Sequence, residues 1–411
     1  MTVVMLIPMY DAIVRRCTTI LDRVADPRGF DHLRYRRRSH AAVRSHDYVF
    51  SQLIPYIGNK RKLLPLIAGA IHHTGCRTGA FVDLFTGSTV VARMAKSMGF
   101  SVLANDWEPY SFEIALGSVA LSRVPEFRAL GGTERVLTRL NTLPPLHGYV
   151  ATHLCPQDDE RPDHERERQF FTRQNGERID AIRETIAEWQ TAGLLDRQEL
   201  AFLLCGLTYA VSYVSNTSGV FKAFHRGWGG PPGTALYRIR SQLRLRPPIL
   251  YDNGLVHRAT ASDAQTLAPH LTDLLGARPD IVYLDPPYNQ HPYGSNYHVL
   301  NTVALWDKPA VSPTITGRGD KSAIRRDWRD SRRSTYNSSQ EALPAFRALI
   351  NSIDAHWILL SYSTDGNMSL RDVLDTVAQR GAVAVFTQPY KRYRVSTPRM
   401  SHRPRTMEIL V

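Results

Sequence analysis

The chain has 411 residues, of which 43% are hydrophobic, and its formal net charge is +13 at pH 7. This size allows one large domain or roughly two to three ordinary ones, and the positive charge predicts an acidic partner such as nucleic acid. The four cysteines are far apart, and no apolar run reaches the roughly 18 residues of a membrane-spanning helix. The apolar opening lacks a preceding basic region and is a poor signal peptide. We therefore expect a cytoplasmic protein with no zinc site, no disulfide framework and no membrane partner.

Residues 1–48 precede every motif and show no helix or strand periodicity. They contain a run of arginines: Arg34, Arg36, Arg37, Arg38 and Arg44. The segment is either an arm that contacts nucleic acid or an over-long start of the reading frame, and its composition does not choose between the two.

Residues 53–64 read L-I-P-Y-I-G-N-K-R-K-L-L. Gly58 and Asn59 permit a tight turn, and Lys60 opens a helix. A backbone turn followed by cations suits a carboxylate or a phosphate, although such a signal is weak by itself.

Residues 81–90 read F-V-D-L-F-T-G-S-T-V, which predicts a strand, a glycine-bearing turn and a helix. This is the pattern of the first βα turn of a doubly wound sheet, where a nucleoside-like cofactor binds. A second strand is predicted at residues 101–104. Asp106 follows it, 23 residues after Asp83, which is the offset of a ribose-binding acid. The absence of G-x-G-x-x-G disfavours NAD.

The sheet pattern stops over residues 126–249. Residues 180–193 predict an amphipathic helix, and Asp196 with Glu199 predicts a capping box at the start of another. Residues 215–233 then interleave basic and aromatic side chains on a glycine-rich segment. This composition is typical of a nucleic-acid surface, and a solvated basic loop is the alternative.

The sheet resumes near residue 255, and residues 281–288 read I-V-Y-L-D-P-P-Y. The apolar run predicts a strand buried on both faces, which the two prolines end. Asp285 and the Pro286 carbonyl are both acceptors, and two acceptors on one exocyclic amine localise its lone pair. Tyr288 offers a flat face for a base taken out of the duplex. The alternative is that Pro286 and Pro287 simply stop a strand.

The remaining residues predict a polar loop at 317–333, a helix capped by residues 338–341, and strands at 356–361 and 383–387. The loop holds seven Lys or Arg against three Asp. Clustered cations without apolar partners predict contacts to phosphates.

The motifs together resemble the Dam-like N6-adenine DNA methyltransferases. Y-I-G-N-K-R-K-L-L resembles the family's first cofactor motif, F-V-D-L-F-T-G-S its glycine-bearing loop, N-D-W its ribose-binding acid and D-P-P-Y its catalytic motif. S-N-T-S-G-V-F resembles part of the recognition domain, and residues 289–307 are similar to members from restriction–modification systems. One departure is Thr89, where the family usually has a second glycine.

The resemblance implies an α/β fold: a Rossmann-like methyltransferase sheet at residues 49–125 and 250–411, with an inserted, mainly helical target-recognition domain at 126–249. It implies S-adenosylmethionine as cofactor, double-stranded DNA as substrate, a nucleoid-associated protein in a bacterial cytoplasm, and in some members a cognate restriction endonuclease. The catalytic residues would be Asp285, Pro286, Pro287 and Tyr288. The cofactor-binding residues would be Tyr56, Asn59, Lys60, Asp83, Phe85, Gly87, Asp106 and Asp263. The DNA-binding residues would be Lys222, His225, Arg226, Arg325 and Arg326.

Three other functions stay open at this point. An N4-cytosine methyltransferase faces the same chemistry, although Asp rather than Ser at the start of D-P-P-Y favours adenine. An RNA adenine methyltransferase is possible, although an insertion of this size fits duplex DNA better. The chain could also be an inactive DNA-binding relative, against which the intact D-P-P-Y and Asp106 argue.

Overall fold

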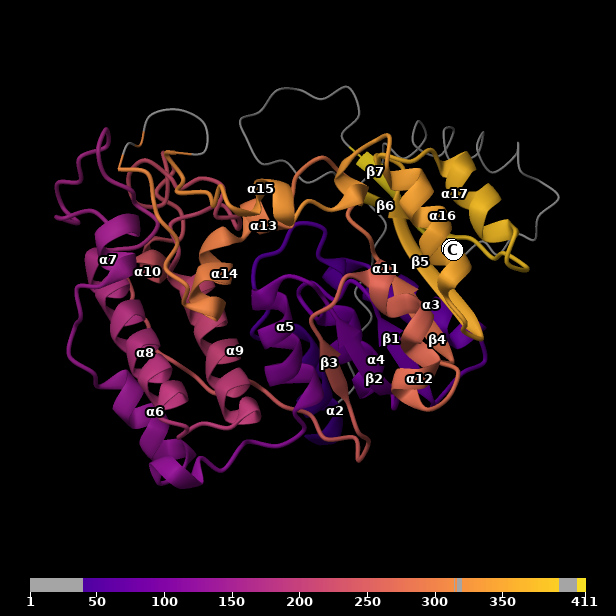
Figure 1. The fold of residues 1–411 in the computed structure, drawn as a ribbon, viewed down its shortest axis with the longest axis horizontal. Helices are drawn as coiled ribbons and strands as arrows, with labels where there is room; N and C mark the ends of the chain where they lie inside the picture. Colours follow the sequence, from indigo (N-terminus) through magenta and orange to yellow (C-terminus); the bar gives the residue numbers. More distant parts are fainter. Residues whose placement is uncertain (1–39, 314, 316–319, 392–404) are drawn as a thin grey trace.

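The computed structural model describes residues 40–313, 315, 320–391 and 405–411, which include one sheet of seven strands (Figure 1). The strands lie in the order β3-β2-β1-β4-β5-β7-β6. Their bounds are β1 (Ala80–Asp83), β2 (Ser101–Asn105), β3 (Arg258–Thr260), β4 (Ile281–Leu284), β5 (Trp357–Ser363), β6 (Phe386–Lys391) and β7 (Arg405–Leu410). The first five in this order run parallel, whereas β7 runs antiparallel between β5 and β6. The predicted α/β class is confirmed.

Helices cover both faces of the sheet, which is why β4 is buried along its whole length. Phe81 and Tyr283 face one side, where they share a core with α2 (His40–Phe50), α3 (Leu64–His73) and α4 (Val90–Ser97). Val82 and Leu84 face the other, because successive side chains of a strand alternate. The helices on that side are α11 (Ala264–Leu267), α12 (Leu271–Leu275), α16 (Ala342–Ser352) and α17 (Leu370–Ala378).

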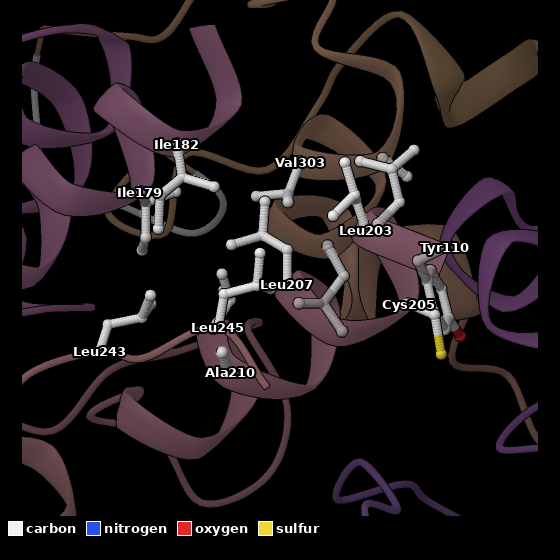
Figure 2. Close-up of a cluster of buried hydrophobic side chains, with 14 of the residues drawn as sticks. Tyr110, Ile179, Ile182, Leu203, Cys205, Leu207, Ala210, Leu243, Leu245 and Val303 are labelled. Carbon is white, nitrogen blue, oxygen red and sulfur yellow. The ribbon is translucent and has the colours of Figure 1, made fainter. Parts of the chain in front are cut away.

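A group of helices lies beside the sheet and has its own core (Figures 1 and 2). It comprises α5 (Pro109–Ala115), α6 (Thr133–Asn141), α7 (Tyr149–Leu154), α8 (Arg173–Thr191), α9 (Arg197–Val214) and α10 (Leu236–Ile239). Helix α14 (His298–Leu305), which follows β4 in the chain, adds Val299, Leu300 and Val303 to this core. The helical region is thus formed mainly by the predicted insertion, together with α5 from before it and α14 from beyond the catalytic motif. The limits 126 and 249 stay a prediction.

The first residue of α9 agrees with the sequence prediction, whereas that of α8 does not. Helix α9 begins at the predicted capping box: Asp196 Oδ1 accepts from the Glu199 N–H at 2.8 Å, and Glu199 Oε2 accepts from the Asp196 N–H at 3.0 Å. Helix α8 begins well before the predicted residue 180, because its first half is polar yet buried. Asn175 and Arg178 there bond to backbone carbonyls of a neighbouring loop. None of the helices described combines the length and hydrophobicity that crossing a bilayer requires.

The C-terminal elements differ in detail from the sequence prediction. Helix α16 is present, but its N-cap residue is Glu341 and no side chain caps it. The strand predicted at 383–387 starts at Phe386 instead. Strand β7 was not predicted, because its apolar run is too short to indicate a strand. The strand is stabilised by pairing with β5 on one side and β6 on the other. Residues 392–404 of the basic tail lie outside the described residues.

Helix α2 crosses the predicted boundary at residue 48, so the prediction that residues 1–48 contain no helix is wrong for its last part. Residues 1–39, with the arginines at 34, 36, 37 and 38, lie outside the described residues. Tyr48 is fully buried, and its hydroxyl donates to the Ser118 carbonyl at 3.0 Å. The buried Arg93 donates to the carbonyls of Tyr48 and Ser51 at 3.3 and 3.1 Å. The end of α2 therefore belongs to the core on one face of the sheet.

Two replacements of Tyr48 should separate the contribution of its buried ring from that of its hydroxyl hydrogen bond. Tyr48→Ala removes a large buried side chain and should lower the free energy of unfolding by about 3–5 kcal/mol. Tyr48→Phe keeps the ring and loses only the bond to Ser118, which should cost about 1 kcal/mol. Urea denaturation followed by circular dichroism measures both. A Tyr48→Ala protein as stable as wild type would show that the boundary at residue 48 was right.

Candidate active site

The carboxyl ends of β1, β2, β3 and β4 meet at one edge of the sheet, because these strands are parallel neighbours. Asn105, a buried residue at the end of β2, holds the edge together. Its Nδ2 donates to the carbonyls of Leu84 and Ser262, both at 3.0 Å, and its Oδ1 accepts from Thr260 at 2.8 Å. A cleft opens here, and six of the predicted site residues line it: Tyr56, Phe85, Asp106, Asp263, Asp285 and Pro287.

Asp285 and Lys60 form an ion pair beside the cleft, with 2.8 Å between Asp285 Oδ1 and Lys60 Nζ. Lys60 also donates to the Gly58 carbonyl at 3.1 Å, and its ammonium lies 5.6 Å from the centroid of the Tyr288 ring. Burial raises the pKa of Asp285, and Lys60 opposes this rise. Burial alone would lower the pKa of Lys60, but the Asp285 carboxylate, together with Tyr288, Glu408 and Tyr283, more than offsets that effect, and the pKa lies well above its ordinary value. Lys60 is therefore the counter-ion of Asp285.

The turn after β1 approaches two other elements closely, and Gly87 makes this possible. Its φ is +48°, and a Cβ at this position would lie 2.8 Å from the ring of Tyr56. The Gly87 N–H donates to Asp106 Oδ2 at 2.8 Å, and Asp106 Oδ1 accepts from the Glu108 N–H at 3.0 Å. The predicted closeness of Asp106 to the glycine-bearing turn is confirmed.

Thr89, which stands in place of the family's second glycine, has a φ of +67°, in the left-handed region that β-branched residues rarely adopt. Its side chain is buried and bonded: Oγ1 donates to the Ser88 carbonyl at 2.6 Å and accepts from Arg93 Nε at 3.0 Å. Since Arg93 also bonds to the end of α2, Thr89 connects the glycine-bearing turn to that helix. A glycine could not make this connection.

Besides Asp285, several buried carboxyl groups surround the cleft and the ion pair. Burial raises the pKa of Asp83 to about 8 and that of Asp106 above its ordinary value. Burial likewise raises the pKa values of Glu108 and Glu408 to about 7. Asp83 Oδ1 and Glu408 Oε2 have no hydrogen-bond partner among the described residues. Carboxyl groups that lack partners favour a positively charged ligand, so this group fits a cofactor that carries ammonium and sulfonium charges.

The remaining predicted cofactor residues have different positions. Asp263 begins α11 and accepts from the Gln265 N–H at 2.8 Å, on the side of the cleft that Tyr336 closes. The Tyr336 ring meets Phe85 edge-on, with centroids 5.8 Å apart. Asn59 does not line the cleft: its Oδ1 accepts from the Arg61 N–H at 2.8 Å and so holds the turn that orients Lys60.

Residues that follow D-P-P-Y supply parts of the site that the sequence did not assign. Tyr293 and Tyr297 stack with Tyr56, with centroids 5.3 and 5.0 Å away. Asn301 donates to Glu108 at 2.6 Å. The signal that could have identified them is their spacing of four residues. Helix α13 ends and α14 begins at Tyr297, and backbone bonds join Tyr297 to Tyr293 and Asn301 to Tyr297.

Basic residues from two separate loops come together near the catalytic motif. Lys222 Nζ lies 3.5 Å from Nδ1 of His291, three residues after Tyr288 in the chain. Lys321 lies over the ring of Phe224, 5.4 Å from its centroid. Burial, and then the charge of Arg226, lower the pKa of Lys321, so Arg226 also lies close to it. His225 packs its ring against Gly230 within the same loop.

The two arginines predicted to bind phosphates differ in their surroundings. The Arg325 side chain is 7% exposed and pairs with Asp307 at 2.5 Å and with Asp327 at 2.6 Å. The Arg326 side chain is 72% exposed and pairs with Asp320. Two carboxylates neutralise Arg325, so we correct its expected role from phosphate contact to holding the loop. Residues 316–319 of this loop lie outside the described residues.

Comparisons with known proteins agree with this geometry. The family profile for the D12 class N6 adenine-specific DNA methyltransferases matches residues 56–356. The chain is 31% identical over 342 residues to the type II methyltransferase M.NlaIII of Neisseria lactamica, an alignment that covers 82% of this chain and 92% of that enzyme. It is 30% identical over 347 residues to the modification methylase StsI of Streptococcus sanguinis and to the type II methyltransferase M.FokI of Planomicrobium okeanokoites. These alignments cover 82% of this chain but only 48% and 49% of those enzymes. No solved structure matches the chain significantly.

The raised pKa of Asp83 leads to a test of cofactor binding. If a cationic methyl donor binds beside this carboxyl group, it stabilises the charged form, so a proton is released and the affinity falls as the pH drops below about 8. Calorimetry with S-adenosylmethionine near pH 7, in buffers of different ionisation enthalpy, measures that release. Asp83→Asn should release fewer protons and bind about tenfold more weakly or worse.

Asp263→Asn is the matched control, because Asp263 lies at the other side of the cleft. It should release as many protons as wild type. Equal release by Asp83→Asn and wild type would show that Asp83 does not meet the positive charge.

Proposed function

The chain belongs to the D12 class of N6-adenine-specific DNA methyltransferases. From this premise we propose which residues bind the cofactor, bind the DNA and methylate one adenine in a specific duplex sequence. It is an enzyme of the restriction–modification type that uses S-adenosylmethionine as methyl donor. A cognate endonuclease that cleaves the same unmodified sequence is part of the proposal, as is a location on the DNA of a bacterial cytoplasm.

The catalytic step is assigned to the end of β4. When bound, S-adenosylmethionine supplies a methyl group made electrophilic by its sulfonium. Asp285 and the Pro286 carbonyl accept from the target amine, which localises the lone pair on nitrogen as the new bond to carbon forms. Asp285 then lies nearest to take the proton that the amine loses. Pro287 fixes the backbone of the motif, and Tyr288 stacks on the extruded base.

Lys60 has two roles in this assignment. It pairs with Asp285 and so favours the carboxylate form that accepts from the amine. Its bonds to Asp285 and Gly58 use two of the three N–H donors of an ammonium. The third donor is assigned to the carboxylate at the methionine end of the cofactor.

The other cofactor contacts follow from the carboxyl groups and the glycine-bearing turn. Asp83 and Gly87 receive the methionine end, Asp106 the ribose hydroxyls and Asp263 the cofactor adenine. The observations that support this order are the bond between Asp106 and the Gly87 N–H and the position of Asp263 across the cleft. Tyr56, held between Gly87 and the stacked Tyr293 and Tyr297, forms the wall between cofactor and target base.

The DNA-binding surface is assigned to the loop at 216–233 and the loop around Lys321. Asn216 shapes the first loop: its buried side chain accepts from the Gly229 N–H at 2.9 Å and donates to the His225 carbonyl at 3.0 Å. The exposed cations Lys222 and Arg226 project from this loop next to the catalytic motif. The alternative reading of a solvated basic loop does not explain why Lys222 reaches His291 beside the catalytic motif, or why Lys321 of the second loop lies over Phe224 of the first.

The observation that carries the proposal is the position of Asp285, held at the end of β4 by Lys60 and facing the cofactor cleft. Sequencing the DNA of an expressing host with modified-base detection tests the function and identifies the target sequence. A host that expresses Asp285→Asn at the same level is the control. N6-methyladenine in one sequence context, present with wild type and absent with the variant, is the expected result; unmodified DNA in both would refute the proposal.

Variants of the motif should separate chemistry from base capture. Asp285→Asn loses an interaction that strengthens in the transition state, so single-turnover methylation should fall by about 3–4 kcal/mol, a few hundredfold or more, while DNA binding stays close to normal. Tyr288→Ala should lose about 1–3 kcal/mol of stacking and flip the base less completely. The readouts are methylation and 2-aminopurine fluorescence at the target position. A near-normal rate for Asp285→Asn would mean that Asp285 only ends the strand.

The basic surface has its own test. Lys222→Ala combined with Arg226→Ala should weaken binding to all duplexes and reduce the slope of log K against log salt by about two units. Fluorescence anisotropy over a salt series measures the slope. The control is Arg278→Ala, which removes a cation before β4, at the opposite edge of the sheet. If the double variant keeps the wild-type slope, this surface does not contact DNA.

A further inference from the structure

A cavity of about 480 Å³ lies beside the catalytic motif and has no role in the assignments above. One wall consists of residues just after D-P-P-Y, and the other belongs to the segment around α15 (Trp328–Ser331). Figure 1 shows α15 next to α13 (Tyr293–Asn296). The lining residues are Gln290, Pro292, Gly294, Ser295, Arg325, Trp328, Arg332, Arg333 and Asn337.

The ring of Trp328 is already occupied by two guanidinium groups. Arg325 lies 4.1 Å and Arg332 lies 4.3 Å from its centroid. Arg332 also donates to the Trp107 carbonyl and lies 5.8 Å from the Trp107 ring. A nucleobase therefore has little of the Trp328 ring left to stack on, and the cavity is not built to hold a base.

The charge of the cavity favours an anion instead. Two carboxylates neutralise Arg325, whereas Arg332 bonds to an uncharged carbonyl and lies near the carboxyl groups of Asp106 and Glu108 without an ion pair to either. Arg333 is exposed, and no ion pair joins it to another described side chain. The remaining polar lining, which includes Gln290, Ser295 and Asn337, supplies amide and hydroxyl donors. Guanidinium, amide and hydroxyl groups around one cavity are the donors that bind phosphate oxygens.

The cavity is fixed to the catalytic motif. Asn337 Nδ2 donates to the carbonyl of Asn289 at 2.6 Å, and Asn289 directly follows Tyr288. A nucleotide held by Asp285 and Tyr288 therefore has its neighbouring phosphates within reach of this cavity. We propose that the cavity lined by Arg332 and Arg333 binds one phosphate of the DNA backbone next to the flipped adenosine. This inference rests on the proposed function, and it adds a subsite that holds the strand while the base is out of the duplex.

The site also touches the cofactor cleft, because one segment lines both. Ser334, Thr335 and Tyr336 line the cleft, while Arg332 and Arg333 before them and Asn337 after them line the cavity. Arg332 bonds to Trp107, which directly follows the ribose-binding Asp106. Replacing Arg332 would thus disturb both sites, whereas Arg333 reports on the cavity alone.

The experiment uses the full chain and a duplex that carries the target sequence, together with copies that each contain one methylphosphonate, which removes the charge of a single phosphate. For wild type, one position beside the target adenine should weaken binding about tenfold. Arg333→Ala should lower the affinity for the unmodified duplex by a similar factor. For Arg333→Ala, the methylphosphonate at that same position should lower the affinity little further, because the substitution and the methylphosphonate remove the same contact.

Arg326→Ala is the matched control, since Arg326 is an exposed arginine of the same loop that does not line the cavity. The loss of affinity caused by Arg326→Ala should add fully to the loss caused by the same methylphosphonate. If every methylphosphonate weakens Arg333→Ala as much as it weakens wild type, the cavity does not hold a phosphate. This failure is distinct from failure of the proposed function, because wild-type methylation of the target duplex is measured in the same preparations.

Discussion

The ion pair between Lys60 and Asp285 is the interaction on which the rest of the site depends. It joins the first motif of the chain to the catalytic motif, more than two hundred residues later, and Lys60 is almost completely buried. Removing one partner of such a pair leaves an uncompensated charge, so each residue fixes the other. Asp285 follows β4, which lies directly beside β1 in the sheet. The parallel order thus places the Asp285 carboxylate at the edge where the glycine-bearing turn also ends.

A second constraint is the excess of carboxyl groups around this pair. Burial raises the pKa values of Asp83, Glu108 and Glu408, and oxygens of Asp83 and Glu408 lack hydrogen-bond partners among the described residues. Buried carboxyl groups without partners raise the free energy of the empty site, and a bound cation lowers it. The methyl donor carries the charge that the site lacks. The electrostatics of the protein and of its cofactor are therefore complementary.

The segment after the catalytic motif connects the parts of the molecule. Tyr293 and Tyr297 stack on the wall of the cofactor site, and Asn301 bonds to Glu108. Further along, α14 packs into the helical region, and Asp307 after it pairs with Arg325 of the basic loop. One short stretch thus contacts the wall of the cleft, the helical region and the basic loop.

The sequence by itself determined the α/β class, the order of the motifs and most strands, because strand burial, proline and glycine act over a few residues. It also located the capping box of α9 and the approach of Asp106 to Gly87. Tertiary structure decided which charges are neutralised. Arg325 and Arg326 are adjacent and identical in type, yet only Arg325 is buried between two carboxylates. Tertiary structure also placed α2 in the core. Such outcomes depend on contacts between residues far apart in the chain, and no local pattern encodes those contacts.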